Sequence, residues 1–260
     1  MASALVDSHC HLDAGEFDRD RAAVVARAVA AGVARQVVPA THAEAWPKLR
    51  DVCAAHSGLH PAYGLHPTFL EHHRPEHLDT LRDWLAHERP VAVGECGLDY
   101  YVEGLDRDAQ QRFFEGQLRL AREFDLPLIL HARRAVEAVI VAIRRVGGLR
   151  GVVHSFAGSE EQARQLWEMD FMIGLGGPLT YARAKRLHRI VAAMPIERLL
   201  LETDAPDQPD ASIRGQRNEP ARLTRVLDAV AELRGEDPDR LAAATSANAQ
   251  RLFGLDEAAA

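Results

Sequence analysis

Histidine and aspartate alternate near the start of the chain, where residues 7–13 read DSHCHLD. In a β-strand alternate side chains point the same way, so these four polar residues can share one face while Cys10 points to the other. Imidazole and carboxylate groups at this spacing are typical metal ligands, although a strand of hydrogen-bonded polar residues has the same pattern. Other potential ligands must converge on His9 and His11 for the metal interpretation to hold.

Several apolar runs further along the chain also end in potential ligands. Eight runs rich in Val, Ile and Leu are predicted as strands, over residues 4–11, 35–40, 62–67, 91–96, 126–132, 151–156, 171–176 and 198–204. The potential ligands at their carboxyl ends are His9, His11, His66, Glu95, His131, His154 and Asp204. The remaining histidines fall in predicted helices or loops, where a solvated or capping role is the simpler interpretation: His42, His56, His60, His72, His73, His77, His87 and His188.

Stretches of helical periodicity lie between and after the predicted strands, over residues 17–32, 43–56, 75–88, 107–124, 133–146, 159–169, 181–193 and 219–252. The last stretch is expected to form two helices separated near Gly235 to Pro238. Repeated strand–helix units predict an α/β fold, the (β/α)₈ TIM barrel, in which the carboxyl ends of all strands meet at one rim. A doubly wound sheet is the alternative, because periodicity does not show whether the sheet closes.

In a barrel the potential ligands would form one cluster in a poorly solvated mouth. Crowded imidazoles and carboxylates are costly to bury there, and a bound cation offsets that cost. The 260 residues contain 47% hydrophobic residues and no low-complexity linker, so a single domain over residues 1–260 is expected. The net charge of −7 argues against broad wrapping of nucleic acid but allows a local basic rim.

The sequence also bears on location and redox chemistry. It has no apolar stretch of membrane-spanning length and no pattern of a secretory signal, so we expect a cytoplasmic protein without a membrane partner. Cys10, Cys53 and Cys96 form no C-x-x-C pair. This cysteine usage argues against a disulfide framework or a zinc knuckle.

A series of motifs in order resembles those of the TatD family of metal-dependent hydrolases and deoxyribonucleases: DSHCHLD, GLHP, GECGLDYY, LILHAR, HSFAG and LLLETDAPD, followed by RNEP. The resemblance spans nearly the whole chain. It implies a barrel of the metal-dependent amidohydrolase type with one to three divalent ions, acting on DNA phosphodiesters or, in other members, as a D-aminoacyl-tRNA deacylase. Position by position it implies the metal ligands His9, His11, Glu95, His131, His154 and Asp204.

Physical chemistry adds roles to this ligand set. Glu95 can bridge two cations about 3.5–4 Å apart. His9, His11 and Asp204 would complete the coordination shell of one ion, and His131 and His154 that of the other. Mixed imidazole and carboxylate ligation suits Zn²⁺, Mn²⁺, Co²⁺ or Ni²⁺, and Mg²⁺ can occupy the carboxylate-rich side. A metal-bound hydroxide would attack phosphorus or a carbonyl carbon while Asp204 orients it and relays its proton, so Asp204 and Glu95 are the predicted catalytic residues.

Four further residues are candidates for supporting roles. Glu202 shares a strand face with Asp204, and His66 precedes a proline; each could bind an additional metal ion or support a ligand. Arg133, two positions after His131, and Arg217, in RNEP, could bind substrate phosphate.

Three other features concern substrate stacking, a helix start and the acidity of the mouth. Tyr100 and Tyr101 could stack on a base or pack in the wall of the site, and Asn218 has the residue type of a helix N-cap. The loop after the last strand carries Asp207 and Asp210, which resembles the YjjV-like branch of the family. Acid near the mouth disfavours a long polyanion.

We therefore predict a monomeric metal-dependent hydrolase of ester bonds, foremost a 3′–5′ exonuclease on single-stranded DNA ends that uses two divalent ions. The alternatives are hydrolysis of a small phosphodiester, ester or amide, including D-aminoacyl-tRNA deacylation, and a non-catalytic metal-binding protein. An intact ligand set argues against the last of these.

Overall fold

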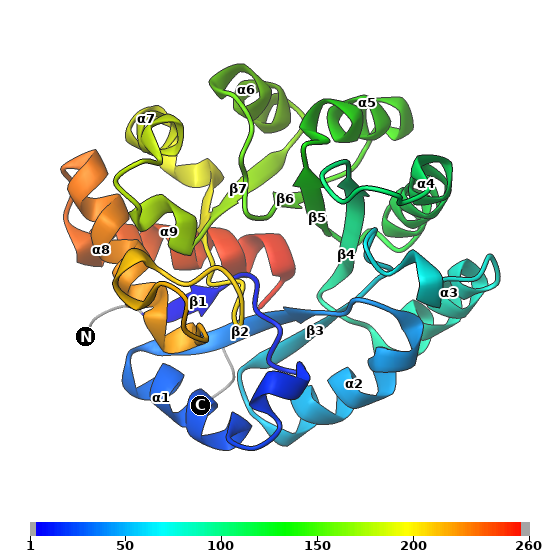
Figure 1. Ribbon diagram of the computed structural model, residues 1–260, viewed down its shortest axis with the longest axis horizontal. Helices are drawn as coiled ribbons and strands as arrows, with labels where there is room; N and C mark the ends of the chain where they lie inside the picture. The colour runs from blue at the N-terminus through cyan, green and yellow to red at the C-terminus, as the bar shows by residue number, and fades with distance from the viewer. Residues whose placement is uncertain (1–3, 256–260) are drawn as a thin grey trace.

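The computed structural model describes residues 4–255, whose eight parallel strands curl into a nearly closed barrel surrounded by helices (Figure 1). The strands are β1 (Leu5–Asp7), β2 (Val33–Pro39), β3 (Leu59–Tyr63), β4 (Ala92–Asp99), β5 (Leu128–Arg133), β6 (Gly151–Val153), β7 (Phe171–Leu175) and β8 (Leu199–Leu201). They neighbour one another in sequence order from β1 to β8. A doubly wound sheet reverses its strand order at a switch point, so this order confirms the predicted barrel.

Backbone hydrogen bonds join the segments at β8 and β1 and bring the two edges of the sheet together. The amide of Ser8 donates to the carbonyl of Leu201 over 3.0 Å, and the amide of Asp204 donates to the carbonyl of His9 over 2.9 Å. Asp7 adds a side-chain link, because its Oδ1 accepts from the Thr203 amide over 3.0 Å. The segments that carry His9 and Asp204 are therefore neighbours although almost the whole sequence separates them.

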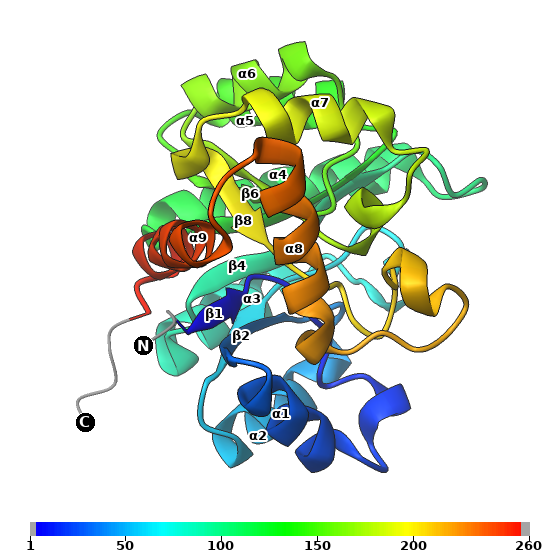
Figure 2. The same ribbon diagram turned by 90° about the vertical axis from the view of Figure 1, so that its left-hand side faces the viewer.

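The helices are α1 (Arg21–Ala30), α2 (Trp46–Ala55), α3 (His77–Glu88), α4 (Arg107–Glu123), α5 (Val136–Val146), α6 (Glu160–Glu168), α7 (Lys185–Ala193), α8 (Leu223–Arg234) and α9 (Pro238–Phe253). The predicted break between the last two is confirmed, since left-handed Gly235 ends α8 and the Asp237 side chain caps α9. Figure 2 shows α9 at the end of the barrel opposite to the loop that follows β8. Within residues 4–255, no helix is both long enough and apolar enough to cross a membrane.

Four strands, β1, β3, β6 and β8, end three or four residues before their predicted carboxyl ends, and β4 ends three residues beyond its own. β1, β6 and β8 end at Asp7, Val153 and Leu201, because the ligand-bearing residues that follow them leave the hydrogen-bonded ladder and enter the mouth of the barrel. β4 instead continues to Asp99. Gly97 permits this close pairing with β5, since a Cβ at that position would lie 2.0 Å from the carbonyl oxygen of His131.

Candidate metal centre

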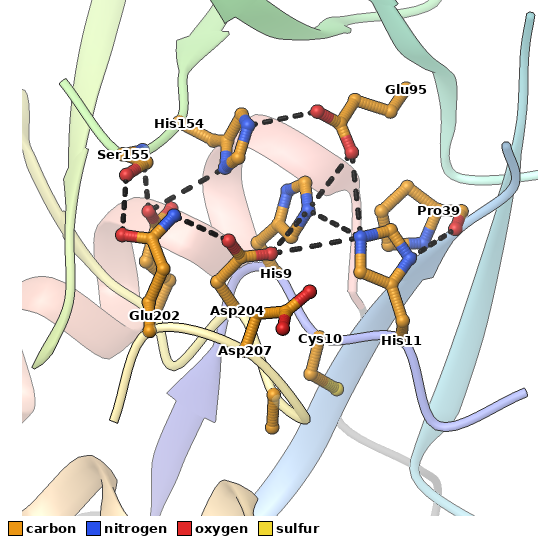
Figure 3. Close-up of polar contacts among 12 residues, drawn as sticks. His9, Cys10, His11, Pro39, Glu95, His154, Ser155, Glu202, Asp204 and Asp207 are labelled. Atoms are coloured by element: carbon orange, nitrogen blue, oxygen red, sulfur yellow. Dashed lines mark hydrogen bonds and ion pairs between the residues drawn. The ribbon is translucent and has the colours of Figure 1, made fainter. Parts of the chain in front are cut away.

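Four donor atoms meet at the carboxyl end of the barrel beside the junction of β8 and β1. The Nε2 atoms of His9 and His11 lie 3.2 Å apart, and Glu95 Oε2 lies 3.2 Å from the first and 3.5 Å from the second. Asp204 Oδ1 lies 3.4 Å and 3.6 Å from the same two nitrogens. Figure 3 shows these side chains pointing toward one another and Cys10 pointing away, as the alternation in the sequence predicts.

A second group of donor atoms surrounds the other carboxylate oxygen of Glu95. This oxygen, Oε1, lies 2.8 Å from His154 Nε2 and 3.1 Å from His131 Nδ1, and those two nitrogens are 3.3 Å apart. Each oxygen of Glu95 thus faces a different pair of histidines. This is the arrangement expected of a bridging carboxylate.

Neighbours outside the cluster set the tautomers of two histidines. Nδ1 of His11 donates to the carbonyl of Pro39 over 3.1 Å, so Nε2 turns its lone pair toward Glu95. Nε2 of His131 donates to Asp99 Oδ2 over 2.9 Å, which leaves the lone pair of Nδ1 facing the cluster. A neutral imidazole whose outer nitrogen carries the proton is the form that binds a metal ion.

Burial and charge act in opposite directions on these groups. Burial would raise the pKa of Glu95, but the imidazole of His154 and its neighbours hold that pKa well below its usual range. Burial would lower the pKa of His154, but Glu95 raises it to about 10. Burial raises the pKa of Asp204. The buried carboxylates therefore require positive charge, which protonated histidines or bound cations can supply.

The spacing of the donor atoms fits divalent cations. A tetrahedral ion with bonds of about 2.1 Å needs ligand atoms about 3.4 Å apart. The separations around Glu95 Oε2 and Oε1 run from 2.8 to 3.6 Å. Because lone pairs this close repel one another unless a proton or a cation lies between them, the residues present suit a resident metal cofactor.

His66, one of the two predicted additional ligands, joins the cluster through Glu95. Its Nε2 lies 3.1 Å from Glu95 Oε1. The backbone amide of Thr68 donates to His66 Nδ1 over 3.2 Å, so in the neutral ring Nε2 carries the proton. His66 therefore donates a hydrogen bond to Glu95, which favours a supporting role over metal ligation.

Glu202, the other predicted additional ligand, is buried behind His154. Its Oε1 accepts from the amide of Ser155 and lies 3.8 Å from His154 Nδ1. Burial raises the pKa of Glu202 to about 8. Gly174 makes room for this carboxyl, because a Cβ there would lie 2.2 Å from Glu202 Oε2. Ligand atoms of Glu202, His154 and His9 lie within 4.8 Å of one another, which fits the predicted additional ligand as well as support of the His154 ring.

A cavity of about 930 Å³ opens over the cluster, and Arg133 is among its lining residues. The guanidinium carbon of Arg133 lies 3.6 Å from the ring centroid of Tyr101, whose exposed fraction is 46%. Tyr100 instead packs against the core, with Arg107 over its ring at 4.4 Å. Arg133 therefore lines the cavity with Tyr101 packed against it, whereas Tyr100 belongs to the core packing.

The RNEP motif does not contribute as predicted. Arg217 donates to both carboxylate oxygens of Asp20, over 2.9 and 2.7 Å, and is not among the cavity residues, so the predicted phosphate contact is not supported. Asn218 caps no helix, since α8 begins at Leu223. Its Nδ2 donates to the carbonyl of Thr203 over 2.8 Å and so holds the loop after β8.

The two carboxylates of the loop after β8, Asp207 and Asp210, differ in whether they reach the cavity. Asp207 lines the cavity, as the sequence suggested. Asp210 is buried and accepts two hydrogen bonds from Arg222, over 2.7 and 3.0 Å. Its charge is thus neutralised, and it adds no acidity to the mouth.

Several residues near the site were not predicted from the sequence. Asp99 lies four positions after Glu95 on the same strand, so the period of two could have identified it. His42 lines the cavity edge and His72 packs on it, although both were assigned to solvated positions. Two more of those histidines are not loop residues in solvent, because His60 lies within β3 and His73 is buried.

Comparison with known proteins agrees with the fold and with a metal-dependent hydrolase. The family model described as TatD related DNase matches residues 6–254. The metal-dependent hydrolase YjjV of Escherichia coli K12, described as uncharacterized, is 40% identical over 259 residues, covering 98% of this chain and all of that protein. Its crystal structure superposes with a TM-score of 0.93 at 38% identity, covering 98% and 100% of the two chains.

A relative with a more specific name is the 3′–5′ ssDNA/RNA exonuclease TatD of Klebsiella pneumoniae, 33% identical over 261 residues, with 97% of this chain and 98% of that protein covered. The fold and the donor set define an enzyme, a metal-dependent hydrolase built on a TIM barrel. The chain belongs to the TatD family.

Proposed function

We propose that this hydrolase is a nuclease that removes nucleotides from the 3′ end of single-stranded DNA and binds two divalent ions through His9, His11, Glu95, His131, His154 and Asp204. The observation that carries the proposal is the position of Glu95, which faces one pair of histidines with each carboxylate oxygen. Two ions held by such a set would lower the pKa of a water and stabilise charge on the phosphate.

Residues of the chain itself supply proton transfer and substrate binding. Asp204 lines the cavity, so its carboxylate is placed to accept the proton of the attacking water. Gln208 donates to Asp204 Oδ2 and fixes the direction of the carboxylate. At the cavity edge, Arg133 stacks on the ring of Tyr101, and its guanidinium can bind a phosphate.

The size of the cavity supports a chain end as the substrate. Its volume of about 930 Å³ is that of a small-molecule pocket, which admits a splayed terminal nucleotide rather than the side of a duplex. The name of the Klebsiella pneumoniae relative supports both the single strand and the 3′ to 5′ direction.

The test compares linear single-stranded, linear duplex and closed circular single-stranded DNA, each labelled, with metal-loaded protein. We expect the linear single strand to shorten from its 3′ end while the circle stays intact. The variant D204N, purified in parallel, controls for contaminating nucleases. Equal cutting of circles would exclude an exonuclease, and hydrolysis of D-aminoacyl-tRNA without cutting of any DNA would favour the deacylase alternative.

A further inference from the structure

Three side chains outside the metal centre converge at the edge of the cavity. His42 and Glu44 lie at the turn after β2, where a 3₁₀ helix spans Ala43–Ala45, and His72 ends the 3₁₀ helix Leu70–His72 after β3. Their nitrogen and oxygen ligand atoms all lie within 4.8 Å of one another. Glu44 Oε2 lies 3.1 Å from His72 Nδ1 and 3.9 Å from His42 Nε2. Two loops distant in sequence thus bring two imidazoles to one carboxylate.

The ring of His42 is held in place on several sides. Its Nδ1 lies 2.8 Å from the hydroxyl of Thr41, and when that hydroxyl accepts, the lone pair of Nε2 faces Glu44. The ring stacks on Phe69, with centroids 5.3 Å apart and planes 13° apart, and packs on the ring of His72 at 4.7 Å. Burial and the nearby His72 lower the pKa of His42, which favours the neutral ring that a metal ion requires.

We propose that His42 Nε2, the Glu44 carboxylate and His72 Nδ1 form a peripheral binding site for one divalent transition-metal ion such as Zn²⁺, separate from the centre around Glu95. Two imidazoles and one carboxylate are a donor set that Zn²⁺ uses, and three protein ligands leave a coordination position open. Mg²⁺ prefers oxygen ligands and water, so this site discriminates against it. Glu44 is half-exposed and the site has only three protein ligands. We therefore expect it to bind Zn²⁺ more weakly than the centre around Glu95, so that it is occupied last.

This site lies beside the path into the cavity. His42 and His66 both line that cavity, and Phe69 packs between them, with centroids 5.3 Å from His42 and 5.7 Å from His66. A cation bound at His42 would add positive charge at the edge, opposite in sign to the neighbouring carboxylate of Asp13, which also lines the cavity. An anionic substrate would therefore meet a cation before it reaches the centre.

The test measures Zn²⁺ bound per chain by equilibrium dialysis for wild type, the double variant H42Q/H72Q and the control H87Q. His87 is exposed and belongs to none of the groups of potential metal ligands found in residues 4–255. Its replacement therefore removes a histidine without changing the proposed site. We expect the double variant to bind one Zn²⁺ fewer than wild type and H87Q to match wild type. With Mg²⁺ as the probe, the three proteins should bind equally.

Equal Zn²⁺ stoichiometry and affinity in wild type and the double variant would overturn the proposal. The single variant E44Q, at a side chain that is 54% exposed, serves if the double variant fails to fold, and it should weaken the last Zn²⁺ bound. Anomalous scattering from zinc-soaked crystals gives the position directly: a peak between His42 and His72 supports the site, and its absence at saturating Zn²⁺ contradicts it. These readouts do not depend on nuclease activity.

Discussion

The interior of the barrel has two levels that are both largely buried and chemically opposite. The lower level is an apolar cluster at the end covered by α9, made of Val6, Val37, Ala62, Ala92, Ile129, Val152, Met172 and Leu200 from the strands. The upper level holds the histidines and carboxylates of the metal centre. At the ends of two strands a step of only two residues separates the levels, from Val152 to His154 and from Leu200 to Glu202.

The exposed fractions show that burial does not separate the two levels. Leu200 is 0% exposed and Glu202 is 1% exposed, and the values for Val152 and His154 are 1% and 5%. Burial of the aliphatic side chains stabilises the fold by about 25 cal/mol for each Å² removed from water. Burial of ionisable groups costs free energy unless charges balance. We infer that the lower level maintains the barrel and that the upper level is kept for its chemistry.

The largest expected effect is on turnover in the upper level. The variant D204N keeps the size of the side chain but cannot accept a proton, so kcat should fall by about a hundredfold to ten-thousandfold. The free energy of unfolding and the metal content should stay close to wild type. Single-turnover kinetics, denaturant unfolding and elemental analysis on one preparation check all three values. Near-normal turnover in a metal-replete variant would remove Asp204 from proton transfer.

The matching change in the lower level should affect stability alone. Leu200 is fully buried in the apolar cluster, so L200A should lower the free energy of unfolding by about 2–5 kcal/mol through lost burial and a cavity. Metal stoichiometry and kcat should hold at temperatures where the variant remains folded. A loss of bound metal in folded L200A would show that the two levels are not independent.

The barrel itself could be predicted from the sequence because apolar runs and helical stretches alternate along the whole chain. Each of the eight predicted strands overlaps an observed strand. The convergence of His9, Glu95 and Asp204 also followed, since parallel strands in a barrel end at one rim. What failed depended on partners distant in sequence. Arg217 is bound by Asp20 and Asp210 by Arg222, and neither pairing leaves a local pattern.

A smaller effect is expected from Asp99, which orients His131 without facing the Glu95 side of the ring. D99N replaces the anionic acceptor of the Nε2 proton with a neutral amide, so metal affinity should fall by about 10–100-fold. The control is D106N. Asp106 accepts hydrogen bonds from two backbone amides that follow it. It lies at the start of α4, where it caps the helix. Competition with a metal chelator measures both variants, and equal affinities would leave Asp99 a purely structural role.

The smallest expected effect concerns Asp210, a buried carboxylate that, unlike Asp204, has a full set of partners. Burial would raise its pKa, but hydrogen bonds from Arg222 and Ser212 lower the pKa below its ordinary value. The folded state then binds fewer protons than the unfolded state, so the stabilisation is present above the unfolded pKa of about 3.9 and is lost as the pH falls through the folded value.

The variant D210N should therefore lower the free energy of unfolding by about 1 kcal/mol at pH 7. The difference from wild type should shrink as the pH falls below about 4, because wild-type Asp210 then becomes neutral as well. Denaturant unfolding of both proteins across this pH range measures the change. A difference that is independent of pH would mean that the charge of Asp210 does not contribute to stability and that shape and neutral hydrogen bonds hold Arg222.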